Sequence, residues 1–149
     1  MANYVRKVPA FEVAPALQDD RKLDLNVIYT TVRATRATLE AAVQYARELD
    51  AHIVIVAAQV VPYPLPLEEP PVLLEFTENA LWSMAAEQPV ETMVEIYLCR
   101  DRRETLREIL QPESPVMIAG KSRRWWPGSE QRLAEALRRD GHRVIFLNP

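Results

Sequence analysis

The sequence predicts an α/β fold, a three-layer sandwich built on a five-stranded parallel sheet. Along residues 25–149, short β-branched runs alternate strictly with segments of helical periodicity, and such alternation implies parallel strands joined by right-handed crossovers. Residues 52–59 are almost continuously apolar, which is typical of a central strand covered on both faces. With no repeat and no low-complexity tract in 149 residues, we expect one such domain.

The first expected strand covers residues 25–32, a β-branched and aromatic run. Thr35 then stands where a helix cap is expected, ahead of an amphipathic helix. Its predicted buried stripe consists of Leu39, Ala42, Val43, Ala46 and Leu49. The second strand, residues 52–59, follows this helix directly.

A proline-rich loop at residues 62–71 separates the second strand from the next helix, because five prolines there enforce irregular backbone. The helical period returns over residues 72–88 and stops at Pro89. Its predicted buried stripe is Leu73, Phe76, Ala80 and Met84. Residues 94–99 alternate between apolar and polar side chains, which predicts a half-exposed strand at a sheet edge.

The remaining elements carry clear boundary signals. Asp101 and Glu104 resemble a capping box for a short helix, and residues 115–119 predict a buried fourth strand. Ser129 is the expected cap of the last helix, and Gly141 stands where a helix needs a left-handed residue after its end. Apolar positions predict the buried sides of these helices: Leu106, Ile109, Leu110, Leu133 and Leu137.

The final strand, residues 142–147, is apolar and close to the C-terminus, so we expect it at the other sheet edge. Residues 1–24 have a mixed composition with Pro9, Pro15 and isolated apolar residues such as Phe11. They form either an ordered arm packed on the domain or a frayed terminus. The arm is favoured because a frayed terminus would leave the apolar side chain of Phe11 in water. The expected division is therefore an extension, 1–24, and a domain, 25–149.

Composition excludes several classes of function. Hydrophobic residues make up 48% and charged residues 26% of the chain, and the net charge is −3, which gives no general attraction to nucleic acid or to an anionic membrane. Cys99 is the one cysteine, so we expect a buried or edge thiol in a reducing compartment. Two histidines and one cysteine argue against a zinc cluster.

We expect a cytoplasmic protein without membrane insertion, since the chain has no apolar run of about 18 residues and no secretory signal. Ser122 and Ser129 have no histidine nearby in the sequence, and no Ser/His/Asp or Cys/His arrangement is visible. These observations predict a protein that is not an enzyme, with no catalytic residues and no metal site.

Two glycines bracket the loop between the fourth strand and the last helix. Gly120 ends the strand, Gly128 precedes the helix, and the loop between them is basic. Such a loop either cradles an anion with backbone N–H groups at the helix N-terminus or is a simple turn with solvated basic side chains. A P-loop is excluded because its spacing requires a glycine where the chain has Pro115.

With this loop after the fourth strand and a Gly-Ser pair opening the last helix, residues 25–148 resemble the universal stress protein family. Val116–Gly120 and Gly128–Ser129 are the best-matched segments. The resemblance implies the adenine nucleotide alpha hydrolase-like sheet order 3-2-1-4-5, and commonly a homodimer through the C-terminal strand. Family members that bind ATP wrap its phosphates with a Gly-x-x-Gly, nine residues, Gly-Ser/Thr motif, and they carry an acidic residue after the first strand.

Carried over by position, the resemblance is partial. Arg123 replaces the second glycine, and four residues separate it from Gly128, so the loop is five residues shorter than the motif. The acidic position falls at Thr30 or Thr31. A side chain in place of glycine hinders close approach of phosphate, and a short loop offers fewer N–H groups. The candidate ligand-binding residues are Thr30, Thr31, Ala57, Ala58, Gly120, Lys121, Ser122, Arg123, Gly128 and Ser129.

We therefore predict a universal stress protein-like regulatory or stress-response module that departs from standard ATP binding and needs no obligatory cofactor. One alternative is a nucleotide-binding protein for ATP or AMP with weak or no hydrolysis. Another is a protein–protein adaptor that uses the loop at residues 62–71 and the pair Trp125–Trp126. These tryptophans could stack on a base, cover the loop as a lid, or meet a partner subunit.

Overall fold

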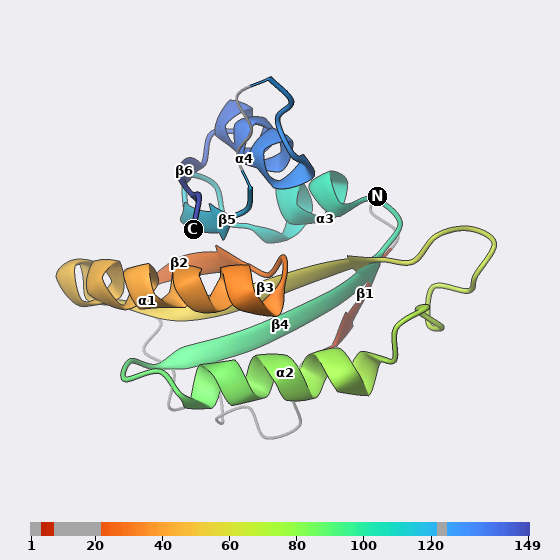
Figure 1. Ribbon diagram of the computed structural model, residues 1–149, viewed down its shortest axis with the longest axis horizontal. Coiled ribbons are helices and arrows are strands. Elements are labelled where there is room, and N and C mark those ends of the chain that lie inside the picture. Colours follow the sequence, from red (N-terminus) through yellow and green to blue (C-terminus); the bar gives the residue numbers. More distant parts are fainter. Residues whose placement is uncertain (1–3, 8–21, 122–124) are drawn as a thin grey trace.

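The computed structural model describes residues 4–7, 22–121 and 125–149, which contain six strands and four helices (Figure 1). In chain order these elements are β1 (Tyr4–Lys7), β2 (Leu23–Ile28), α1 (Val32–Leu49), β3 (Ala51–Val60), α2 (Leu74–Ala86), β4 (Thr92–Cys99), α3 (Arg102–Ile109), β5 (Pro115–Ala119), α4 (Ser129–Arg139) and β6 (Arg143–Leu147). None of these helices is long and apolar enough to cross a bilayer.

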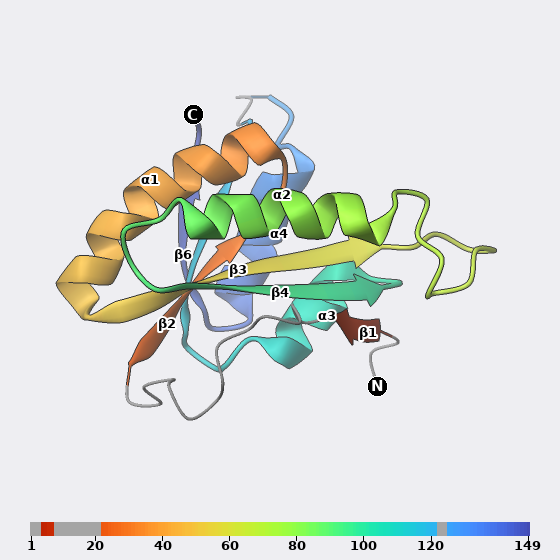
Figure 2. The same ribbon diagram turned by 90° about the horizontal axis from the view of Figure 1, so that it is seen from below.

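The strands form one sheet of order β1-β4-β3-β2-β5-β6. All pairings among β2 to β6 are parallel. Counted from β2, the five parallel strands have the order 3-2-1-4-5, so the predicted fold class and strand order are confirmed. Figure 2 shows how strongly the sheet twists, with β5 and β6 running across the direction of β3 and β4.

The edge next to β4 differs from the prediction. Residues 94–99 were expected to form a sheet edge, and this is wrong, because β1 pairs antiparallel with β4 from Tyr4↔Cys99 to Lys7↔Ile96. β1 therefore forms the edge, and Ile96, Leu98 and Cys99 are buried. The alternation in β4 indicated two unlike faces and carried no information about this neighbour.

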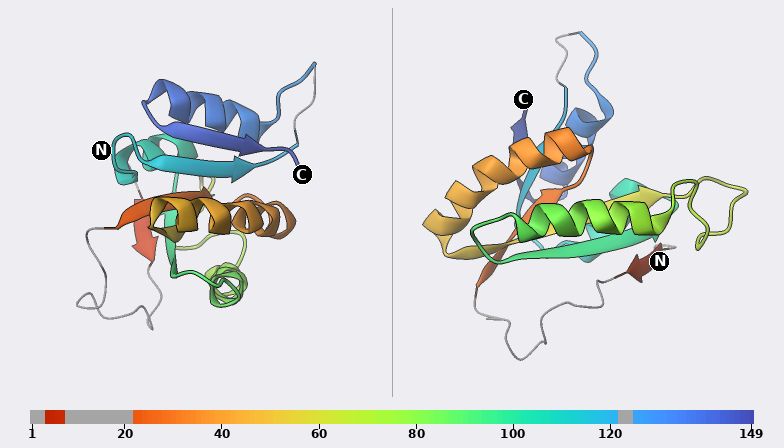
Figure 3. Two further views of the ribbon diagram at one scale, coloured as in Figure 1. Left: turned by 90° about the vertical axis from the view of Figure 1, so that its left-hand side faces the viewer. Right: turned by 60° about the horizontal axis from the view of Figure 1, so that its bottom comes forward.

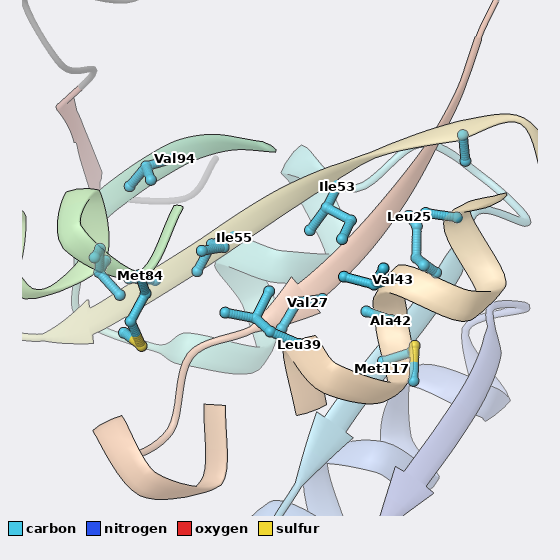
Figure 4. Packing of buried hydrophobic residues seen from close by; sticks show 14 of the residues in the cluster. Leu25, Val27, Leu39, Ala42, Val43, Ile53, Ile55, Met84, Val94 and Met117 are labelled. Carbon is cyan, nitrogen blue, oxygen red and sulfur yellow. The ribbon is translucent and has the colours of Figure 1, made fainter. Parts of the chain in front are cut away.

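Helices cover both faces of the sheet, as a three-layer sandwich requires (Figure 3). α1 and α2 lie on one face, where Leu39, Val43 and Met84 pack against strand residues such as Ile53 and Ile55 (Figure 4). α3 and α4 lie on the other face. The residues of this second cluster include Ile28, Val54, Val56, Leu106, Ile118, Leu133 and Leu137. Each crossover thus buries one apolar helix stripe against the parallel strands.

The start of α1 is earlier than predicted. Thr31 is the N-cap, and its hydroxyl oxygen accepts a hydrogen bond from the amide of Ala34 at 3.1 Å. The predicted cap Thr35 lies inside the helix, fully buried, where its hydroxyl oxygen accepts from the amide of Thr30 at 3.2 Å. The strand β2 consequently ends at Ile28, and residues 29–31 form the connection. The predicted buried residue Leu49 is exposed, at the end of the helix.

The buried side of α2 is also displaced from the prediction. Leu73 and Phe76 were expected inside and are 76% and 69% exposed, and Thr77 and Leu81 are buried in their place. The predicted burial of Met84 is confirmed. Leu73 is the residue before the helix, so the stripe starts one residue later than the apolar pattern indicated. Several large apolar side chains in this region therefore face solvent.

Of the two predicted N-caps in the last two helices, the one for α3 is confirmed and the one for α4 is wrong. Asp101 caps α3 as expected, its carboxylate accepting from the amide of Glu104 at 2.9 Å. For α4 the N-cap is Gly128 rather than Ser129, and no side chain caps this end. Gly141 has φ 98° and its amide donates to the carbonyl of Arg138, which completes the predicted left-handed helix end.

Candidate functional site

The crevice between β2 and β5 is the point where the strand order reverses. From β2 the chain proceeds through β3 and β4 on one side, and then returns to place β5 and β6 on the other. The β2–β5 ladder covers only Asn26↔Val116 and Val27↔Met117. Beyond it, the hydroxyl of Thr30 donates to the carbonyl oxygen of Ala119 at 3.1 Å. Ligands of parallel α/β sheets bind at such a switch point, beyond the carboxyl ends of the strands.

A pocket of about 340 Å³ opens at this crevice. It is formed by the connection from β2 to α1, the end of β5 and the first turn of α4. The residues that line it are Thr30, Thr31, Arg33, Ala34, Ala119, Gly120, Lys121, Glu130 and Pro149. We call it the switch-point pocket, and its volume lies in the range of ligand sites for small molecules.

The first turn of α1 gives one wall of the pocket a positive potential. The hydroxyl oxygen of Thr31 accepts a hydrogen bond from the amide of Ala34. The amides of Val32 and Arg33 have no acceptor within the helix. The helix macrodipole adds positive charge at the same end. Arg33 and Lys121 line the pocket, and both are exposed. This wall is suited to a polar ligand that presents hydrogen-bond acceptors.

The side chain of Glu130, in the first turn of α4, lies in the space between Gly120 and Gly128, the two glycines of the loop from β5 to α4. A Cβ atom added to Gly120 would be 2.5 Å from the Cβ of Glu130 and 3.2 Å from its Oε2. A Cβ added to Gly128 would be 3.6 Å from the same Oε2. The carboxylate therefore occupies the space between the glycines at the N-terminus of α4, where acidic groups are electrostatically favoured. A phosphate entering there would meet like charge.

The structure places four of the sequence-predicted site residues on the pocket wall: Thr30, Thr31, Gly120 and Lys121. Ala57 and Ala58 lie within β3, which runs on to Val60, and they are not among the lining residues. Gly128 is the N-cap of α4, and Ser129 faces a different hollow. Ser122 and Arg123 lie outside the described residues. Arg33 and Glu130 are lining residues that the sequence analysis did not select.

A buried Ser–His contact that the sequence analysis missed lies at the amino ends of the strands. The Oγ of Ser114 is 3.5 Å from the Nδ1 of His142, and the Nδ2 of Asn26 donates to that Oγ at 3.2 Å. All three side chains are buried. The sequence held a signal for this contact. Ser114 directly precedes β5 and His142 directly precedes β6, and neighbouring parallel strands start at the same edge of a sheet. This network links the strands at the edge opposite the pocket.

His52 forms a second polar cluster at that opposite edge. Its Nε2 is 2.7 Å from Asp24 Oδ1, and its Nδ1 is 3.6 Å from Glu91 Oε2. The ring is buried while both carboxylates are partly exposed. Across residues 4–7, 22–121 and 125–149, no group of three or more histidine, cysteine, aspartate or glutamate side chains is arranged to hold a metal ion.

Cys99 is buried at the end of β4, and its Sγ donates to the carbonyl oxygen of Gln59 at 3.5 Å. Burial raises the pKa of this thiol, because removing water disfavours the thiolate. The protonated form is therefore the one held in the fold. Trp125 and Trp126, in contrast, are 81% and 76% exposed at the end of the candidate loop.

No protein-family model matches this sequence, and the comparison with curated proteins finds no match either.

Proposed function

We propose that this chain is a non-enzymatic regulatory module of the universal stress protein type, which responds to a small polar ligand in the switch-point pocket. The observation that carries the proposal is the lining of this pocket by Thr30, Thr31, Gly120 and Lys121. These are positions at which the family resemblance implies ligand contact. The remaining support is the reversal of strand order between β2 and β5, the usual ligand position in such sheets.

The ligand class that the lining favours is a nucleoside or a nucleoside monophosphate such as AMP. Arg33 and Lys121 supply cationic donors at the rim, and the volume of about 340 Å³ suits a ligand of this size. Glu130 stands at the position of a phosphate cradle. A triphosphate would place its charge against this carboxylate, so ATP is disfavoured relative to AMP.

The test is calorimetric titration of the purified chain with adenosine, AMP, ADP and ATP. In the switch-point pocket, we expect AMP or adenosine to bind more tightly than ATP. In the variant Glu130→Gln, ATP affinity should rise about tenfold, because one close like-charge repulsion of roughly 1–2 kcal/mol is removed. The matched control is Glu48→Gln, which removes an exposed charge from α1 and should leave all affinities unchanged.

Absence of binding for all four ligands at millimolar concentration would contradict the proposal, and so would a preference for ATP that is lost in the variant R33E/K121E, because both of those residues line the switch-point pocket. A gain of ATP affinity in Glu48→Gln equal to that in Glu130→Gln would show an effect of net charge alone. That result would show that Glu130 does not cause the preference for AMP over ATP.

We also propose a cytoplasmic homodimer that forms through β6. In the described part of the chain this strand pairs only with β5, so its outer side has no strand partner, although the carbonyl oxygen of Val144 accepts a hydrogen bond from Arg138. Val144, Ile145, Phe146 and Leu147 remain partly exposed. Such an edge favours pairing with a second copy. Light scattering coupled to gel filtration should give twice the chain mass at micromolar concentration, and a monomer at every concentration would contradict the proposal.

A further inference from the structure

A second hollow lies between α3 and α4, on the face of the sheet away from α1. α3 begins directly after β4, and α4 lies beside it (Figure 1). The hollow has a volume of about 560 Å³. Five arginines line it: Arg100, Arg102, Arg103, Arg132 and Arg139. We call this hollow the arginine groove.

The positive charge of the arginine groove is poorly balanced. The acidic lining residues are Asp101 and Glu135, and the Asp101 carboxylate already caps α3 through the amide of Glu104. Among the residues that the structure describes, no ion pair or hydrogen bond engages the side chains of three of these arginines. These are Arg102, Arg132 and Arg139. Like charges held together in this way repel each other unless an anion binds.

The other two arginines are fixed by neighbours. The Nη1 of Arg100 donates to the carbonyl oxygens of Val61 and Leu65 at 2.9 and 2.8 Å. Its guanidinium carbon also lies 4.1 Å from the ring centre of Tyr63. Arg103 makes a long contact with Asp140 at 3.7 Å. The charge of Arg100 adds to that of the unpaired three, whereas the charge of Arg103 is partly offset by Asp140. The groove is thus basic although the net charge of the chain is −3.

We infer that the arginine groove is a binding site for the polyphosphate group of a small molecule. Guanidinium groups bind phosphate oxygens through paired, charge-assisted hydrogen bonds, and the N-terminus of α3 adds its dipole at one end of the groove. Arg132 and Arg139 are seven residues apart on α4, which separates them by about 10 Å along the helix. A single phosphate can contact both only if the two side chains bend toward it, whereas a chain of phosphates spans this separation directly.

The experiment is calorimetric titration of the whole chain with inorganic tripolyphosphate, and with sulfate as the single-anion comparison. Tripolyphosphate should bind at least about tenfold more tightly than sulfate, because it engages several arginines at once. In the double variant R132E/R139E, tripolyphosphate affinity should fall by roughly a hundredfold. Both arginines are exposed, so the fold should be retained, which circular dichroism checks.

The matched control is R47E/R143E, which reverses two exposed arginines that do not line the groove. It changes the net charge equally and should leave tripolyphosphate affinity within about twofold of the unmodified chain. A second variant, R33E/K121E, alters the switch-point pocket and should also retain this binding. Equal binding of sulfate and tripolyphosphate would overturn the inference. So would equal losses in R132E/R139E and R47E/R143E, or a loss confined to R33E/K121E.

Discussion

Replacing Gly120 by alanine is expected to lower the free energy of unfolding by about 2–3 kcal/mol, the usual cost of overpacking a filled site. The added Cβ would lie 2.5 Å from Glu130 Cβ and 2.8 Å from Glu130 Cγ. A Cβ atom is fixed to its helix, so relief requires the first turn of α4 to move away from β5. Because this turn forms one wall of the switch-point pocket, ligand affinity should fall with stability. Urea denaturation measures the first effect.

A double-mutant cycle with Glu130→Gly isolates this contact. Glu130→Gly alone should cost about 1 kcal/mol, because it places a glycine in the first turn of α4 and removes a carboxylate that is favoured at the helix N-terminus. It also removes the atoms that the new methyl group would strike. The pair G120A/E130G should therefore be more stable than the sum of the two single effects predicts. Strict additivity would contradict the steric account. Gly141→Ala is the second comparison, since it meets no neighbour and acts through its φ of 98° alone.

Much of the fold was predictable because a parallel α/β sheet requires hydrophobic patterns that are visible within short segments of the sequence. The continuous apolar run at residues 52–59 marked the central strand β3, which is buried almost throughout. Strict alternation of strands and helices indicated the parallel sheet that is observed. The glycine at residue 141 marked a helix end because only a residue tolerant of positive φ fits there.

The errors in the fold arose where a distant neighbour decides the outcome. β1 is four residues long, and its strand-forming residues Tyr4 and Val5 are followed at once by Arg6 and Lys7. The segment is too short to show a strand pattern, and its pairing with β4 defines it as a strand. The same limit applies to α2. Leu73 and Phe76 fit a helical stripe with Met84, yet the packing of Leu81 turns a different side of the helix toward the sheet.

The lining of the candidate site was predictable where it follows from the position of the backbone in the sheet. Thr30, Gly120 and Lys121 follow the ends of β2 and β5 and so had to lie near the switch point. Glu130 was missed because its contact with Gly120 depends on how closely α4 approaches β5. The arginine groove was missed for a similar reason. In the sequence, Asp101 and Glu104 indicated only a helix cap, and it is the packing of α3 beside α4 that brings Arg102 and Arg103 near the arginines of α4.

The seam between β2 and β5 explains the last large effect that we expect, in the variant Asn26→Leu. With only two paired residues in this ladder, the Nδ2 of Asn26 extends the seam by donating to Ser114 Oγ and to the carbonyl oxygen of Pro115, both at 3.2 Å. Leucine has a similar size and no donor. Both acceptors would then lie in a buried site without this partner, which should lower the free energy of unfolding by about 2–3 kcal/mol.

The double variant N26L/S114A provides the control, because it removes both the Nδ2 donor of Asn26 and the Oγ acceptor of Ser114. Its loss of stability should be smaller than the sum of the two single losses. Thr30→Val, at the pocket end of the same seam, removes one partly buried hydrogen bond to Ala119 and should cost about 1 kcal/mol. If Asn26→Leu were as mild as Thr30→Val, the seam would be held by its two ladder pairs and by core packing alone. The crevice at the switch point would then owe its shape to α1 and α4 rather than to the polar groups that bridge β2 and β5.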